Sequence, residues 1–216
     1  MTLHLPLDHA ILAVRDLEAA GAAFAAAGFL VTPETRHSAA MGTANRCVML
    51  HGSYIELLAI VEETPANAPW RALLAAGPRL AGLTLASDDI AASAASLSAA
   101  GIRAQATRHF ERATDHGNLR FSIIRIEPEE TPGLQCLFCQ HHTRDLVWLP
   151  DLLDHPNGAT TLDAIALPQA DSLRHLAGSG KVAILSGPAR LTITGRQAAV
   201  HDLTQLCGVT VEVRTP

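Results

Sequence analysis

The feature that most constrains the fold is an internal repeat of one short sequence pattern. Residues 13–29 read AVRDLEAAGAAFAAAGF, and residues 86–102 read ASDDIAASAASLSAAGI. Each copy has an apolar run, an acidic residue, an alanine-rich stretch and then a glycine, which is typical of a strand leading into a capped helix. Further β-rich runs follow each copy. The repeat therefore predicts two units of the same β-α-β-β-β order.

Apolar runs and the turn residues between them predict the elements of the two units. The expected strands lie at 7–14, 29–32, 45–50 and 53–60 in the first unit and at 80–86, 102–107, 119–126 and 134–139 in the second. The expected helices lie at 17–27 and 90–100, polar loops fill the gaps between strands, and a proline-containing linker with a short helical piece spans 62–79.

The C-terminal part continues in the same style. Strands are expected at 162–168, 182–185, 191–194 and 209–213, with helices at 171–177 and near 197–206. We therefore predict one domain over 1–145, made of modules 7–61 and 80–140. Residues 146–216 are predicted to be a linker and a partial βαβββ extension.

Composition excludes several classes of function. The chain has 16 Lys and Arg against 21 Asp and Glu, a net charge of −5, so a nucleic-acid partner is not expected. No segment approaches the ~20 continuous apolar residues of a membrane span, and the N-terminus does not resemble a secretory signal. Four cysteines in a chain of this length do not form a disulfide framework. These features predict a cytoplasmic protein.

Two ionisable residues lie inside apolar strands. Glu56 is in the middle of SYIELLAI and His9 is in LDHAILAV. A buried carboxylate needs a partner, because burying it alone is costly. Glu56 is therefore either in a salt bridge, with Arg36 or Arg46 as the obvious partners, or part of a site, and His9 is either a core histidine bonded to backbone or part of the same site. Alternation places His9 on one face with Leu7 and Ile11.

The opening LDHAILAVRDLEAA, followed by GF and then YIELL, resembles the vicinal oxygen chelate superfamily, which includes glyoxalase, bleomycin-resistance and extradiol dioxygenase proteins. The loop RHSAAMGTANR and the later HPNGA resemble, more narrowly, its glyoxalase-like domain family. This resemblance implies an α+β fold. Paired βαβββ modules would form a curved mixed sheet with a concave cavity, and a smaller α+β extension would follow.

The same resemblance implies a metal site. In the superfamily, the positions of His9 and Glu56 supply ligands to a divalent metal such as Fe, Mn, Ni or Zn, which acts as a Lewis acid on the substrate. The second unit departs from the pattern, because Gly82 and Leu137 stand where a second histidine and glutamate would be. We expect His141, at the end of the last strand, to be the third ligand beside His9 and Glu56.

Polar residues in two loops are candidates for substrate binding. The set before YIELL and the set after the second unit are expected to line the cavity: Arg36, His37, Thr43, Asn45 and Arg46, and His155 and Asn157. The alternative for both sets is turn chemistry that only satisfies the loop backbone.

The sequence therefore predicts a glyoxalase-like protein that binds a small polar or acidic organic molecule. If it is an enzyme, it is a metal-assisted lyase, isomerase or dioxygenase acting through Glu56 and His9. The alternative is a metal-free binding or sequestering protein, like the resistance proteins of the superfamily, which the two missing ligand positions favour. A homodimer stays open, because superfamily members build their sheets within one chain or across two.

Overall fold

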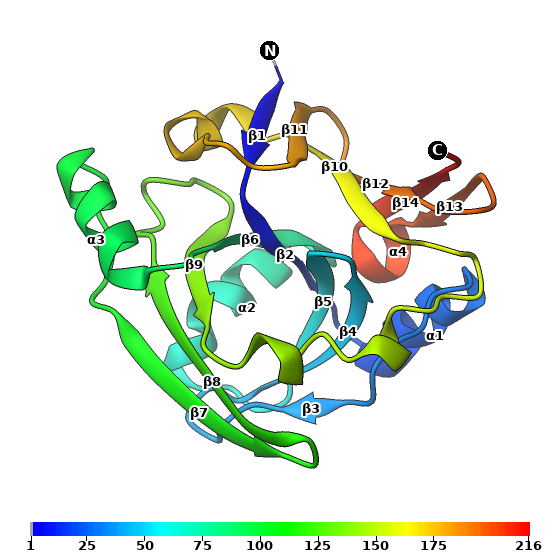
Figure 1. The fold of residues 1–216 in the computed structure, drawn as a ribbon, viewed down its shortest axis with the longest axis horizontal. Helices are drawn as coiled ribbons and strands as arrows, with labels where there is room; N and C mark the ends of the chain where they lie inside the picture. The colour runs from blue at the N-terminus through cyan, green and yellow to red at the C-terminus, as the bar shows by residue number, and fades with distance from the viewer. Residues whose placement is uncertain (1) are drawn as a thin grey trace.

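Two curved mixed β-sheets form the framework of the computed structural model, which describes residues 2–216. The first sheet has eight strands in the order β3-β4-β5-β2-β6-β9-β8-β7. Their bounds are β2 Leu7–Ala13, β3 Thr35–Arg36, β4 Thr43–Leu50, β5 Ser53–Ile60, β6 Arg79–Ala86, β7 Arg108–Thr114, β8 Gly117–Arg125 and β9 Gln135–His141. This sheet curls into a half-barrel (Figure 1), so one of its faces is concave.

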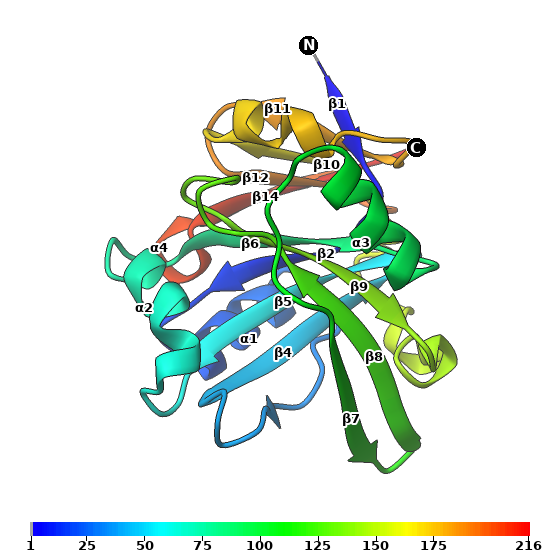
Figure 2. The same cartoon turned by 90° about the vertical axis from the view of Figure 1, so that its left-hand side faces the viewer.

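The second sheet has six strands in the order β1-β11-β10-β12-β14-β13. Their bounds are β1 Leu3–Leu5, β10 Thr161–Leu167, β11 Val182–Ser186, β12 Arg190–Thr194, β13 Ala199–Leu203 and β14 Val209–Arg214. Figure 2 shows this sheet as a separate layer over the first. One hydrophobic cluster joins them, with Leu12 and Leu83 from the first sheet and Ile165 and Val211 from the second.

The helices are short, and α1 and α3 lie where the repeat predicts them. They are α1 Leu17–Ala26, α2 Ala68–Leu74, α3 Ile90–Ala99 and α4 Thr204–Cys207, with 3-10 helices η1 Pro65–Asn67, η2 Arg144–Leu146, η3 Pro150–Leu152 and η4 Ala170–Leu176. Asp16 and Asp89 cap α1 and α3 by accepting backbone N–H bonds. Among residues 2–216, no helix is both long enough and apolar enough to cross a membrane.

The two β-α-β-β-β units pair side by side, which confirms the predicted fold class. In each unit the first strand lies parallel to the last, β2 to β5 and β6 to β9. The two first strands, β2 and β6, then pair antiparallel at the centre of the sheet. Since alternate residues of these strands point into the concave face, the centre of the half-barrel collects side chains from both units.

The second sheet repeats this pairing in a reduced form. At its centre, β10 and β12 pair antiparallel, as β2 and β6 do in the first sheet. On either side the next strand is parallel, β11 to β10 and β14 to β12, as β5 is to β2 and β9 is to β6. The strands beyond these, β1 and β13, pair antiparallel, as β4 and β8 do. The N-terminal strand β1 supplies one edge of this C-terminal sheet. The chain therefore contains a second, smaller copy of the paired-module arrangement.

Three predicted elements are wrong. Residues 29–32 are not a strand, although the backbone N–H of Thr32 still bonds to Cys47. The strand predicted at 102–107 lies instead at 108–114, as β7, in a stretch that reads as a polar loop. The helix predicted near 197–206 is the strand β13 followed by the single turn α4. In β7 and β13 an exposed face carries polar residues, so the apolar pattern that marks a strand is weak.

Candidate functional site

A β-bulge at Asp8 brings two ionisable side chains of one strand to the concave face. Leu7 pairs with Leu85 and His9 with Thr84, so Asp8 is the extra residue between them. A bulge changes the direction in which the following residues point. As a result Leu7 joins the main hydrophobic core, contrary to the predicted alternation, while Asp8 and His9 lie against each other.

His9 is held on three sides. Its Nδ1 donates a hydrogen bond of 2.6 Å to Asp8 Oδ1, because a carboxylate can only accept. In a neutral ring this leaves Nε2 as an acceptor, 2.8 Å from the Thr84 hydroxyl and 3.5 Å from Glu56 Oε2. The Tyr54 ring stacks on the imidazole, with centroids 4.2 Å apart. His9 is therefore buried and oriented, with Nε2 between the Thr84 hydroxyl and the Glu56 carboxylate.

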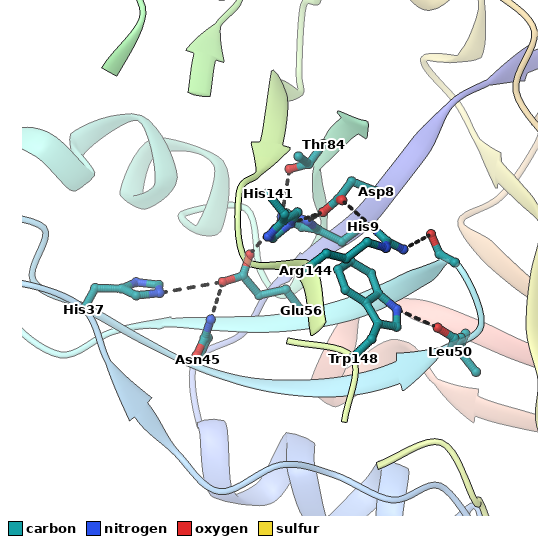
Figure 3. A network of polar contacts seen from close by, with 11 residues as sticks. Asp8, His9, His37, Asn45, Leu50, Glu56, Thr84, His141, Arg144 and Trp148 are labelled. Atoms are coloured by element: carbon teal, nitrogen blue, oxygen red, sulfur yellow. Dashed lines mark hydrogen bonds and ion pairs between the residues drawn. The ribbon is translucent and has the colours of Figure 1, made fainter. Parts of the chain in front are cut away.

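Glu56 is paired with polar groups rather than with an arginine. Its Oε1 accepts a 2.6 Å hydrogen bond from Asn45 Nδ2 and lies 3.9 Å from His37 Nε2. His37 in turn lies 2.7 Å from the Thr43 hydroxyl through Nδ1. Burial lowers the pKa of His37, and the negative charge of Glu56 opposes this shift. Figure 3 shows Asn45 and His37 beside the Glu56 carboxylate.

Asp8 links this cluster to the second unit. Its Oδ1 also accepts from His141 Nε2 at 3.2 Å, while its Oδ2 is buried without a hydrogen-bond partner. Burial alone would raise the pKa of the Asp8 carboxyl, but the bonds from His141 and His9 outweigh it and hold that pKa well below its ordinary value. Cys139, Asp8 and His141 place one ligand atom each within 4.8 Å of one another, a set that could hold a metal ion.

The segment after β9 covers one side of the cluster. Trp148 donates its indole N–H to the Leu50 carbonyl at 3.0 Å, and its ring meets His141 edge-on with centroids 5.3 Å apart. The guanidinium of Arg144 stacks 3.5 Å from the centre of the Trp148 ring and lies 4.0 Å from Asp8 Oδ2. Figure 3 shows Arg144 and Trp148 beside the Asp8–His9 pair. Half-exposed Arg144 is therefore a cation next to the buried anion.

The second unit has no room for a ligand at the position equivalent to His9. A Cβ on Gly82 would lie 2.5 Å from the carbonyl oxygen of Gln135 and 3.1 Å from the ring of Trp70, which comes from α2. Leu137, which stands where a second glutamate would be, is a buried apolar residue. The absence of a second histidine and glutamate is therefore built into the packing.

The structure brings together only part of the predicted site. His9, Glu56, His37, Thr43 and Asn45 lie in one bonded group, and His141 reaches it through Asp8 rather than through Glu56. The other predicted residues, Arg36, Arg46, His155 and Asn157, lie outside this group.

Arg36 is largely exposed and lies 3.4 Å from Glu34. Arg46 contacts Gly21 of α1, on the opposite side of the sheet from Asn45. His155 is buried between the N–H of Leu30 and the carbonyl of Met49, and Asn157 caps the end of α1 through Ala27. His155 and Asn157 thus make structural contacts at α1.

Sequence reasoning missed Asp8, Thr84, Arg144 and Trp148. Asp8 precedes His9, so strict alternation predicts that the two side chains point to opposite faces of the sheet. The bulge at Asp8 brings them together. Thr84 lies on β6, and Arg144 and Trp148 lie in the segment after β9, so their proximity to His9 has no local signal. Two hollows of about 370 and 140 Å³ lie outside this group, one near Arg15 and Arg71 and one between Arg79 and Leu167.

Comparisons with known proteins agree with this fold. A family model described as a glyoxalase-like domain matches residues 7–178. No curated protein matches the chain. A hypothetical protein from Staphylococcus aureus has a similar structure over 97% of this chain and 99% of its own, with a TM-score of 0.73 and 12% identity.

Shorter similarities extend to methylmalonyl-CoA epimerases. The Mycobacterium tuberculosis enzyme matches with a TM-score of 0.50 and 22% identity, covering 64% of this chain and 89% of its own. The Streptomyces coelicolor enzyme, in complex with 2-nitronate-propionyl-CoA, matches with a TM-score of 0.51 and 20% identity, covering 64% and 96%. At these identities the likeness concerns the fold alone.

Proposed function

Since this chain belongs to the glyoxalase-like domain family, we propose that it binds a small polar or acidic organic molecule on its concave sheet face and moves a proton there. The observation that carries the proposal is the buried pair of Glu56 Oε2 and His9 Nε2, 3.5 Å apart, with Asp8 behind the histidine. Buried acid–base groups with fixed partners are typical of sites of proton transfer.

Glu56 is the base in this proposal. Asn45 holds Oε1, which leaves Oε2 to take a proton from a carbon next to a substrate carbonyl. The C–H bond breaks, its electron pair moves toward the carbonyl oxygen, and the proton goes to Glu56. His9 is oriented by Asp8 and can exchange that proton through Nε2. Return of the proton from Glu56 to the former carbonyl carbon of an α-hydroxy substrate, while the hydroxyl proton moves to the other oxygen, gives an isomerase. Departure of a leaving group from the next carbon, with its bonding electron pair, gives a lyase.

A divalent metal fits some of these residues. The buried Oδ2 of Asp8 lacks a partner, and Asp8, Cys139 and His141 converge as carboxylate, thiolate and imidazole donors. His9 and Glu56 are the other pair of donors, and the bond from His9 Nδ1 to Asp8 is the kind that orients a ligand histidine. A bound divalent ion would supply Lewis-acid stabilisation of charge on the substrate oxygen, as in a metal-assisted lyase, isomerase or dioxygenase.

A second candidate function is metal-free binding or sequestering of a small molecule. The packing of Trp70 over Gly82 supports it, because the second unit then lacks its share of ligands. In that case the cluster around Glu56 would serve recognition only.

The test is hydrogen–deuterium exchange at carbon. The protein would be incubated in D2O with methylmalonyl-CoA, 2-oxobutyrate or neutral hydroxyacetone, with and without added Mn, Fe, Ni or Zn, and loss of the C–H signal followed by NMR. Glu56→Gln should slow exchange by about 10²- to 10⁴-fold, since it removes a general base. Glu111→Gln is the matched control, because Glu111 also accepts from an asparagine, Asn118, but is exposed.

If no probe exchanges with or without metal, the proton-transfer proposal is wrong and the binding function remains. If Glu56→Gln exchanges the C–H proton as fast as the wild type does, the base is another residue.

A further inference from the structure

A second feature of the concave face is a cation without a counter-ion. Arg112 lies on the edge strand β7, opposite Leu119 of β8, and shares a face with Phe110. Phe110 stacks on Phe121, which contacts the ring of His141. This row of rings places the face of β7 that carries Arg112 toward the Asp8–His9–Glu56 cluster.

The Arg112 side chain has no partner among the described residues. Its Nε is buried and makes no hydrogen bond, and no hydrogen bond or ion pair joins its guanidinium to another side chain. A guanidinium carries five N–H donors in a fixed fork and is always charged. Holding such a group partly buried and unpaired is costly, so its retention indicates an anion that is bound from outside.

The charge of Arg112 acts on the same residues as the charge of Glu56. Both affect His37 and Cys47, which lie across the half-barrel on and beside β4. Arg112 and Glu56 therefore face the same space from different strands.

Other guanidinium groups set Arg112 in context. Arg125, on the same face of β8, bonds only to the neutral Gln135 at 3.3 Å, and burial followed by the charge of Arg108 lowers its pKa. Arg46 also has an unpartnered Nε, but it contacts α1 on the opposite face. The wall formed by β7 and β8 is therefore cationic, whereas the opposite wall carries Glu56.

We propose that Arg112 binds an oxyanion group of the substrate, a carboxylate or a phosphate, and holds the rest of the molecule against Glu56. This inference rests on the proposed function and narrows its substrate to organic acids or phosphorylated molecules. The fork of Arg112 suits two parallel N–H···O bonds to such a group. Repulsion from Glu56 keeps the oxyanion at the arginine, so the uncharged, reacting part of the substrate faces the base.

Titration calorimetry with malonate, its neutral dimethyl ester and inorganic phosphate tests the inference. We expect malonate or phosphate to bind the wild type and the ester not to bind. Arg112→Gln should weaken that binding on the order of tenfold to a hundredfold, the range expected for hydrogen bonds to a charged group. Arg112→Lys should recover part of it. The matched control is Arg120→Gln, which should bind as the wild type does, because Arg120 is exposed and points to the opposite face of β8 from Leu119, the partner of Arg112.

Preference for malonate or for phosphate identifies the oxyanion. Failure of both anions to bind, or equal binding by Arg112→Gln, would overturn the inference. Failure of this inference can be told apart from failure of the proposed function. If Arg112→Gln removes anion binding but no probe shows carbon exchange, only the proton-transfer proposal is wrong. If hydroxyacetone exchanges equally in the wild type and in Arg112→Gln, and no anion binds, only the oxyanion site is wrong.

Discussion

Replacing Asp8 by Asn tests whether the bulge in β2 holds the site together. The side chain is 1% exposed and accepts from two imidazoles, His9 and His141. Hydrogen bonds to a charged group contribute roughly 1.5–3 kcal/mol each, so the two bonds total about 3–6 kcal/mol. Relief of the cost of burying the charge offsets part of this, and we expect Asp8→Asn to lower the free energy of unfolding by about 2–4 kcal/mol.

The internal copy of the fold offers a matched control. In the second sheet, Asp163 is the extra residue between Leu162 and Ala164, just as Asp8 is in the first. Its carboxylate accepts from the hydroxyls of Thr161 and Thr194 and from no histidine. Asp163→Asn should therefore cost only about 1 kcal/mol, because its bonds come from neutral donors.

The assay is urea unfolding followed by circular dichroism, with thermal unfolding beside it. A loss of 2–4 kcal/mol in a chain of this size corresponds to a fall in melting temperature of about 5–15 °C. The pKa of Asp8 is lower in the folded state, so its stabilisation is full above the ordinary carboxyl pKa of about 3.9 and is lost as the pH falls below it. The gap between wild type and Asp8→Asn should persist from neutral pH to about pH 4 and then narrow. Equal costs for Asp8→Asn and Asp163→Asn would refute the reasoning.

Two further predictions concern the packing at His155 and at Gly82. His155→Ala should lower the free energy of unfolding by about 2–5 kcal/mol, since it leaves the Leu30 N–H and Met49 carbonyl without a partner. Burial lowers the pKa of His155, so the unfolded chain binds protons more readily and wild-type stability should fall as the pH drops below about 6.5. His155→Gln should show a shallower fall between pH 7 and 5 in denaturant titrations, and an unchanged slope would contradict this assignment. Gly82→His should destabilise the protein by about 1–3 kcal/mol and leave metal uptake, measured by elemental analysis, unimproved, because Trp70 and Gln135 occupy the space. A stable variant that gains metal would show that this packing is not the obstacle.

The second sheet has the same strand arrangement as the first but lacks the histidine and the glutamate of the candidate site. By strand register, Ala164 stands where His9 is, and Leu185 stands where Glu56 is. Thr192, like Thr84, faces this position from the neighbouring strand. The fold therefore does not require the ionisable pair, and its presence in the first sheet alone is the reason to assign it a role.

Local pattern was sufficient to predict the two β-α-β-β-β units, and the family resemblance supplied the curved sheet that they form. The repeated order of strand, acidic cap, helix and glycine is a property of neighbouring residues, and so the paired modules follow from the sequence. The positions of His9 and Glu56 on one face follow too, because strand alternation has a period of two and the first and last strands of a unit lie parallel. His37 and Asn45 are close to Glu56 in sequence, which placed them near the site.

Only the tertiary structure decided which other residues join them. One extra residue at Asp8 reverses the face of every side chain on one side of it, and no local signal marks that bulge. In the edge strand β7, which carries Arg112, every second residue is exposed, and most of its residues are polar, so its sequence resembles a loop. Only its pairing with β8 shows that it is a strand. Trp70 reaches the concave face from α2, and Trp148 reaches it from the segment after β9. Such contacts depend on how separate segments pack, which the pattern of any one segment does not contain.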